Sequence, residues 1–294
     1  MLPDHDLYRI LKDLQIIDPN CVKEYAPRVR DRSDISVYRC SKSGVIFLGK
    51  IDQAELSYYV DKDVDAQNLT CEEKQIPFHH IDNARRRAEA FASMIEGKQW
   101  LDFGCGDGAL LEMLGSRAQE AWGVEPNSRH LNTADGGCVQ IVPSLDELSS
   151  KCFDIITLFH VYEHLAEPVK MAETLKSLLN DGGTLLIEVP HARDVLLETF
   201  DSAGFRRFTL WSEHLVLHTR ESLEKFLRAA GFDDVSIFGF QRFPLSNHLY
   251  WLRNNEPGGH EKWDFLDTPE LSAAYFEALE KVDQTDSLIA IARS

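Results

Sequence analysis

The sequence has few cysteines, no long apolar run and little positive charge, and each shortage excludes a class of protein. Its six cysteines are scattered over 294 residues, which suggests no disulfide framework. No run approaches the ~18 apolar residues that a transmembrane helix needs. The stretch from Met1 to Asp6 has neither the basic nor the apolar part of a signal peptide. We therefore expect a cytoplasmic protein without a membrane span.

The charge balance is strongly acidic. Lys and Arg number 31 against 48 Asp and Glu, a formal net charge of −17. Such a surface repels phosphate backbones, so we expect no nucleic-acid partner. Arg85-Arg86-Arg87 is the single run of three basic residues, and it predicts a solvated helix face.

From about residue 84 the sequence alternates helical and strand patterns. The expected strands are 100–103, 121–124, 139–142, 153–159, 184–189, 235–240 and 287–292. The expected helices are 84–95, 109–114, 168–179 and 221–230. This alternation predicts an α/β fold with a Rossmann-like, doubly wound, mostly parallel seven-stranded sheet.

The last two expected strands have no convincing helix between them, so they suit an antiparallel hairpin at the sheet edge. Residues 241–283 would then be an insertion between the two strands of this hairpin. The insertion is rich in aromatic and histidine residues. It is equally consistent with a lid over a substrate and with a docked irregular segment.

A glycine-rich turn joins the first expected strand to a helix: Asp102-Phe103-Gly104-Cys105-Gly106-Asp107-Gly108. Glycines allow a sharp turn and a close approach to a ligand, and a helix N-terminus adds partial positive charge. Glu125 ends the next strand, where a carboxylate can accept both hydroxyls of a ribose. The glycine spacing alone fits both a dinucleotide site and a methyltransferase site. Asp102 favours the second, because it would repel a pyrophosphate and attract an ammonium or sulfonium group.

Five segments together resemble class I S-adenosylmethionine-dependent methyltransferases. They are WLDFGCGDG (100–108), WGVEP (122–126), FDIITLFHVYEHL (153–165), LLNDGGTLLIEVP (178–190) and LEKFLRAAGF (223–232). The resemblance covers about residues 81–240 and implies S-adenosylmethionine as the cofactor. The cofactor-binding residues that it implies are Asp102, Gly104, Cys105, Gly106, Gly108, Glu125, Pro126, Leu145 and His160. Among them, Glu125 would hold the ribose and Leu145 would lie near the adenine.

His160-Val161-Tyr162-Glu163-His164 follows the fourth expected strand and matches the string H-x-x-E-H. In zinc proteases that string lies on a helix, whereas here a strand runs into it, which argues against a protease. Ubiquinone-pathway and small-RNA methyltransferases carry a similar segment in which two Glu and one His bind a divalent metal. His160 replaces the first of those Glu, so we predict no metal, and the segment would pack against cofactor and substrate.

Ser212-Glu213-His214 is the second candidate for catalysis. It resembles the Glu-His pair of deoxysugar C-methyltransferases, and the small-RNA enzymes place a metal-binding His at the position of His214. Histidine is a suitable base for removing a hydroxyl proton. We therefore predict His214, Glu213 and His160 as catalytic residues.

Residues 1–80 are predicted to form an N-terminal β-rich module. The stretches Asp18-Pro19-Asn20-Cys21 and Cys40-Ser41-Lys42-Ser43 resemble the zinc ribbon of sugar methyltransferases. Asp18 and Ser43 stand where two of the four cysteines belong, so the zinc ligands are not intact. The apolar residues Val37, Val45, Ile46, Phe47 and Leu48 would hold the module instead. It could cover the acceptor or mediate a homodimer.

The sequence therefore predicts an N-terminal module and a methyltransferase domain over 81–294. The resemblance favours a sugar, nucleotide-linked or in a glycan, as the acceptor, with O-methylation ahead of C-methylation. Alternatives are a phenol or quinol O-methyltransferase, a non-catalytic S-adenosylmethionine-binding protein, and a nicotinamide oxidoreductase, which Asp102 and the later segments disfavour.

Overall fold

The structure is a computed structural model that describes residues 2–52, 77–127 and 139–294, with the backbone alone for 77–81. Its centre is a seven-stranded sheet. The strands are β4 (Gln99–Phe103), β5 (Glu120–Val124), β6 (Val139–Val142), β7 (Phe153–Phe159), β8 (Leu179–Pro190), β10 (Asp234–Phe240) and β11 (Ser287–Arg293). Their order is β10-β11-β8-β7-β4-β5-β6. β4 to β8 pair in parallel, and β11 is antiparallel to both β8 and β10. The predicted fold class and the antiparallel pair at one sheet edge are confirmed.

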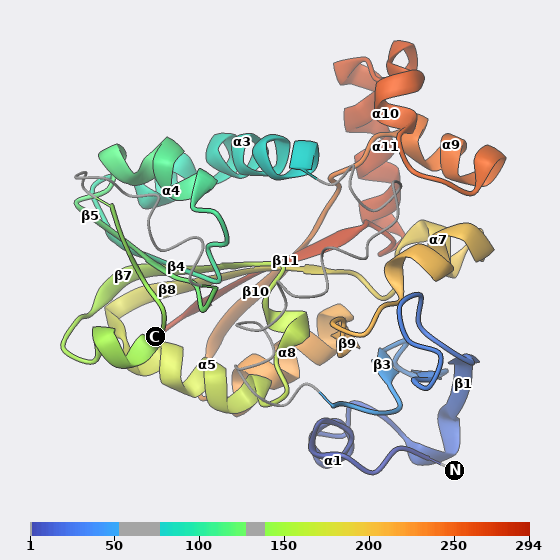
Figure 1. The fold of residues 1–294 in the computed structure, drawn as a ribbon, viewed down its shortest axis with the longest axis horizontal. Coiled ribbons are helices and arrows are strands. Elements are labelled where there is room, and N and C mark those ends of the chain that lie inside the picture. The colour runs from blue at the N-terminus through green and yellow to red at the C-terminus, as the bar shows by residue number, and fades with distance from the viewer. Residues whose placement is uncertain (1, 53–76, 128–138) are drawn as a thin grey trace.

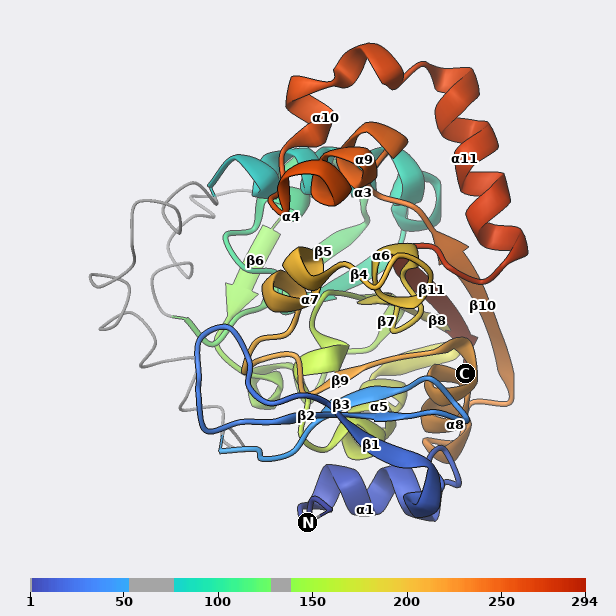
Figure 2. The ribbon, with the colours of Figure 1, turned by 90° about the vertical axis from the view of Figure 1, so that its right-hand side faces the viewer.

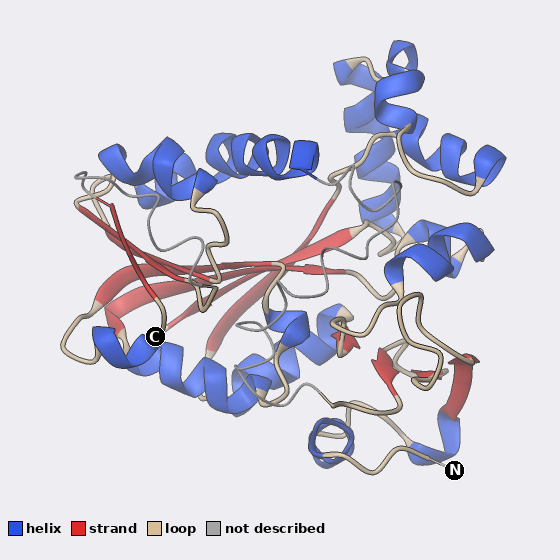
Figure 3. Cartoon of the chain, in the orientation of Figure 1, coloured by secondary structure: helices blue, strands red, loops and turns tan. Residues whose placement is uncertain are grey.

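Helices cover both faces of this sheet (Figures 1 and 3). α3 (Pro77–Ile95) and α4 (Ala109–Leu114) lie on one face, and α5 (Pro168–Ser177) and α8 (Arg220–Ala229) lie on the other. Ile95 packs with Trp100 in the first layer, and Phe226 packs with Ile187 in the second. Because both faces of the sheet are buried, the sequence of β7 is an almost continuous run of apolar residues.

The N-terminal residues form a small antiparallel sheet. It contains β1 (Val22–Ala26), β2 (Val37–Cys40), β3 (Ile46–Leu48) and, from far along the chain, β9 (Val216–Leu217). The helix α1 (Asp6–Asp13) and the short turn η1 (Pro19–Cys21) precede them. Figure 2 shows the small sheet above α1, with β9 beside β3.

The predicted apolar packing of this part is confirmed, because Val37, Val45, Ile46, Phe47 and Leu48 are all buried. Phe47 pairs with Val216, and these residues share one core with the α5–α8 layer. The β-rich character was predicted, but α1 and the strand contributed by residues 216–217 were not.

The predicted insertion at 241–283 is helical. It contains α9 (Leu245–Asn254), α10 (Gly259–Lys262), η7 (Asp264–Leu266) and α11 (Pro269–Lys281), which stand above α7 (Ala203–Thr209) in Figure 1. Trp251 of α9 packs with its ring centroid 5.4 Å from that of Phe205 in α7. α6 (Val195–Glu198) precedes α7, and η4 (Gly115–Arg117), η5 (Leu145–Leu148) and η6 (Tyr162–His164) complete the described elements. Within the described ranges, no helix combines the length and apolar character needed to cross a bilayer.

Candidate functional site

The glycine turn after β4 has a backbone that other residues would adopt only with strain. Gly104, Gly106 and Gly108 have φ angles of 77°, 56° and 78°, in the left-handed region that favours glycine. A Cβ added to Gly104 would lie 2.4 Å from Cγ2 of Val161. The turn therefore passes close to the segment that follows β7.

Glu125 holds this turn from the end of β5. Its Oε2 accepts a hydrogen bond from the Gly106 amide at 3.0 Å, and its Oε1 accepts one from the Asn127 amide at 2.9 Å. A carboxylate has about four acceptor positions, so lone pairs remain for two ribose hydroxyls. Glu125 therefore lies where it could hold the ribose, and this role stays a prediction.

Asp102 lies deeper than its neighbours in the turn. It is 4% exposed, and its Oδ1 accepts a hydrogen bond from Thr157 Oγ1 at 2.7 Å. Burial raises its pKa to about 6, although the Thr157 hydrogen bond opposes the shift. Asp102 thus ties β4 to β7 beneath the turn.

The remaining predicted cofactor residues lie at the same edge of the sheet. The Cys105 side chain packs against β5, because a Cβ added to Gly123 would lie 2.6 Å from its Sγ. Its backbone is used within the turn, because the Cys105 amide donates to the Val124 carbonyl oxygen and the Cys105 carbonyl oxygen accepts from the Gly108 amide. Pro126 is half-buried after Glu125, and Leu145 is half-buried at the start of η5.

His160 directly follows β7 and connects two buried carboxylates. Its φ is 57°, an uncommon value for a residue with a side chain. Its Nδ1 lies 3.2 Å from Glu163 Oε1 and its Nε2 lies 3.1 Å from Glu188 Oε1. Arg242 Nη1 also lies 2.9 Å from that Nε2. These contacts fix the His160 ring.

The prediction that the arginine run is a solvated face is wrong for two of its three members. Arg86 Nη2 donates to Glu188 Oε1 at 2.7 Å, and Arg87 Nε donates to Oε2 at 3.2 Å. Glu188 is fully buried, and its pKa is well below the usual range because these cations and His160 outweigh the effect of burial. Arg85 alone is exposed, near Asp82. The buried counter-charge on β8 turns the other two arginines inward.

Glu163, His164 and His214 form a cluster beside His160. One ligand atom from each lies within 4.8 Å of the others. Burial opposes ionisation of Glu163, but the His160 hydrogen bond and the nearby histidines lower its pKa to about 2. Glu163 Oε2 has no hydrogen-bond partner among the described residues.

His214 is neutral in this cluster. Burial and the neighbouring His164 lower its pKa to about 3. Its Nδ1 lies 2.9 Å from the Thr209 carbonyl oxygen, which can only accept, so Nδ1 carries the proton. His214 Nε2 therefore keeps a free lone pair.

Neutral imidazoles and an ionised carboxylate are the forms that bind divalent cations. The residues present therefore fit such an ion, although the sequence predicted none. Glu213, the predicted partner of His214, is buried and is not a member of this cluster. All three residues are visible in the sequence, but no local pattern in it indicates that His214 lies near Glu163 in space.

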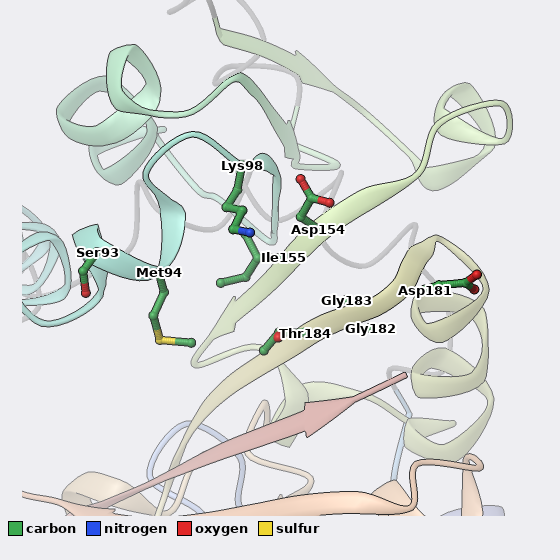
Figure 4. A pocket seen from close by; sticks show the side chains of 9 residues that line it. All are labelled: Ser93, Met94, Lys98, Asp154, Ile155, Asp181, Gly182, Gly183 and Thr184. Carbon is green, nitrogen blue, oxygen red and sulfur yellow. The ribbon is translucent and has the colours of Figure 1, made fainter.

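A separate hollow lies at the opposite, amino-terminal edge of the sheet (Figure 4). Lys98, Asp154 and Thr184 line it, among others. The Asp154 carboxylate already accepts hydrogen bonds from the Gln99 amide and from Asn180. This hollow is remote from the glycine turn and is not part of the candidate site.

Known proteins are similar to this chain in sequence and in fold. A family model described as a methyltransferase domain matches residues 78–237. The chain is 24% identical over 187 residues to a ubiquinone biosynthesis O-methyltransferase of Paraburkholderia phytofirmans, covering 59% of this chain and 81% of that protein. It is 26% identical over 192 residues to a tRNA U34 carboxymethyltransferase of Idiomarina loihiensis, covering 59% of this chain and 56% of that protein.

A solved structure has the same fold. A SAM-dependent methyltransferase from Archaeoglobus fulgidus is 20% identical, with a TM-score of 0.50, covering 73% of this chain and 94% of that one. The glycine turn and the spare acceptor positions of Glu125 fit the cofactor of such enzymes. The chain belongs to the methyltransferase domain family and is an S-adenosylmethionine-dependent methyltransferase.

Proposed function

We propose that this enzyme methylates a hydroxyl oxygen of a small organic acceptor. The observation that carries the proposal is the cluster of Glu163, His164 and His214 next to the glycine turn. A hydroxyl becomes a good nucleophile only when it loses its proton, so the site must favour its deprotonated form. When bound, S-adenosylmethionine supplies an electrophilic methyl group on a sulfonium sulfur.

Each group has a separate task in this proposal. The glycine turn and Glu125 hold the cofactor, and Asp102 supports the turn from beneath. His160 orients the Glu163 carboxylate through its Nδ1 contact at 3.2 Å. Glu163, His164 and His214 would hold a divalent cation, which would lower the pKa of a hydroxyl bound to it.

The lowered pKa of His214 favours one of two roles for this residue. A base works best when its pKa is near the working pH, and a value of about 3 lies well below it. A neutral imidazole with a free Nε2 is a good metal ligand at the same pH. We therefore favour His214 as a ligand, and its predicted role as a base becomes the alternative for the experiment.

The acceptor class is a phenol or quinol in preference to a sugar. The Trp211 ring centroid lies 5.4 Å from that of His214 and 6.2 Å from that of His164, so an aromatic ring flanks the cluster. The similar O-methyltransferase from ubiquinone biosynthesis points the same way. The sugar prediction depended on the ribbon-like start, the aromatic insertion and Glu213 as the partner of His214. Glu213 is not a member of the cluster that contains His214, which weakens the last of these. Sugars remain the second acceptor class.

The test is a methyl-transfer assay with labelled S-adenosylmethionine and two acceptor panels, catechols and hydroquinones in one and nucleotide sugars in the other. Chelator-treated enzyme is compared with enzyme given Mg²⁺, Mn²⁺ or Zn²⁺. We expect transfer to the phenolic panel that the chelator abolishes and the metal restores. Full activity after chelation would assign His214 as the base, and transfer to sugars alone would overturn the acceptor class.

A further inference from the structure

Three arginine side chains gather beside the proposed site. Arg86 and Arg87 bind Glu188, and Arg242 binds Asp286 through an Nε–Oδ1 contact of 3.3 Å. Arg87 and Arg242 are also charged neighbours of Arg86. Three guanidinium cations thus contact two carboxylates, and the ionised Glu163 lies on the other side of the His160 ring from Arg242. In a chain with a net charge of −17, such a group of three arginines is an exception.

Arg86 has unused hydrogen-bond donors. Only its Nη2 reaches Glu188, and its buried Nε and Nη1 have no hydrogen-bond partner within the described part of the chain. A buried donor without a partner costs about 1–3 kcal/mol, so an acceptor atom that reached these donors would be favoured by the missing hydrogen bonds. Burial and the two neighbouring arginines lower the pKa of Arg86, yet a guanidinium stays protonated at any physiological pH.

The position of Arg86 separates it from the cofactor turn. Its guanidinium carbon lies 4.8 Å from the centroid of the Phe240 ring, at the end of the outermost strand β10. The Arg87 guanidinium carbon lies 4.7 Å from the Phe159 ring, at the end of β7, which neighbours β4. Arg87 therefore faces the cofactor side, and Arg86 faces the half of the site left for the acceptor.

We propose that Arg86, supported by Arg242, binds an oxyanion of the methyl acceptor, either a carboxylate or a phosphate. A guanidinium presents its donors in a planar fork that matches both groups. The Phe240 ring and Glu188 hold the guanidinium in place, so little side-chain freedom is lost when an anion binds. This inference rests on the proposed function, because it concerns the acceptor half of the same site. The acceptor is then an anionic hydroxy compound.

The test uses inorganic phosphate as the probe. The protein is saturated with S-adenosylhomocysteine and titrated calorimetrically with phosphate at constant ionic strength. We expect Arg86→Gln to weaken phosphate binding about tenfold or more, as the loss of a charged hydrogen bond implies. Arg86→Lys, which keeps the charge and the contact with Glu188, should weaken it less. Arg85→Gln is the matched control, because it removes an adjacent but exposed arginine, and it should bind phosphate like the wild type.

A second titration identifies the source of the anion. Arg86→Gln should bind S-adenosylhomocysteine and its decarboxylated analogue with the same affinity ratio as the wild type. If the variant loses affinity for S-adenosylhomocysteine alone, the arginine binds the carboxylate of the cofactor and the proposal is wrong. It is also wrong if wild type and Arg86→Gln bind phosphate alike, or if Arg85→Gln weakens binding equally. None of these binding results depends on which hydroxyl is methylated. A failure of this proposal can therefore be distinguished from a failure of the proposed function, which the methyl-transfer assay tests.

Discussion

At the scale of single residues, the chemistry depends on which carboxylate accompanies His214. The sequence places Glu213 next to it, but the structure places Glu163 there, with His164 as the third member. Glu163 is fully buried and is oriented by His160. We therefore propose Glu163, with His214, as the pair that acts on the acceptor.

Substitution separates these two assignments. We expect Glu163→Gln and His214→Asn each to lower kcat about 100-fold or more, within the usual range for losing a group that controls a proton. Glu213→Gln should lower kcat much less. Affinity for S-adenosylhomocysteine, measured by calorimetry, should stay unchanged in all three variants. A larger loss for Glu213→Gln than for Glu163→Gln would restore the pairing predicted from the sequence.

Buried histidines also set the response to acid. Burial lowers the pKa of His214 to about 3 and those of His191, His218 and His248 to about 4. The unfolded chain binds a proton at each below pH ~6.5, whereas the folded chain does not, so stability falls as the pH drops from about 6.5 to 4. Urea unfolding at pH 7.0 and ~5.0 should show a loss of roughly 1–2 kcal/mol per histidine. An unchanged free energy of unfolding would show that these histidines are not neutral in the folded protein.

At the scale of elements, the turn after β4 depends on backbone shape as much as on side chains. Gly104 combines a φ of 77° with the close approach of Val161. Gly97 has a similar φ of 70°, but no atom lies within 4 Å of the position of an added Cβ. The two glycines therefore differ in their surroundings and hardly at all in conformation.

Gly104→Ala and Gly97→Ala form a matched pair. Each should lose about 1–2 kcal/mol from the left-handed backbone. Gly104→Ala should lose more, because Val161 must move, and its affinity for S-adenosylhomocysteine should fall as the turn shifts. Chemical denaturation and calorimetry measure both effects. Equal losses in the two variants would mean that the contact with Val161 does not shape the turn.

Local patterns predicted most elements of the large sheet and missed contacts between distant segments. The strands β4 to β8 could be predicted because apolar runs end in glycine and polar turns. The helix α1 is only eight residues long, which gives a weak periodic signal. The inward side of the Arg85-Arg86-Arg87 run depends on Glu188, about a hundred residues away. Likewise, the approach of His214 to Glu163 is set by tertiary packing.

At the scale of the whole molecule, the N-terminal sheet and the methyltransferase domain are joined through β9. Phe47 of β3 pairs with Val216, and the core of the small sheet is continuous with that under α5 and α8. The sequence predicted a boundary near residue 80. Because the two parts share a sheet and a core, we expect each to depend on the other for folding.

Removal of the first part tests this dependence. A variant containing residues 77–294 should lose cooperative thermal unfolding or aggregate, because it exposes β9 and the apolar surface that the N-terminal sheet covers in the full chain. Circular dichroism during heating and size-exclusion chromatography measure these properties. A monomeric variant with the melting temperature of the full chain would support two independent domains.

The central claim concerns the cofactor at the glycine turn, and one calorimetric comparison tests it most directly. Chelator-treated wild type and Glu125→Ala are each titrated with S-adenosylhomocysteine and with NADH. We predict a micromolar dissociation constant for S-adenosylhomocysteine with the wild type, a loss of about tenfold or more in the variant, and no binding of NADH. Binding of NADH alone, or equal affinity of both proteins for S-adenosylhomocysteine, would contradict the proposed cofactor site.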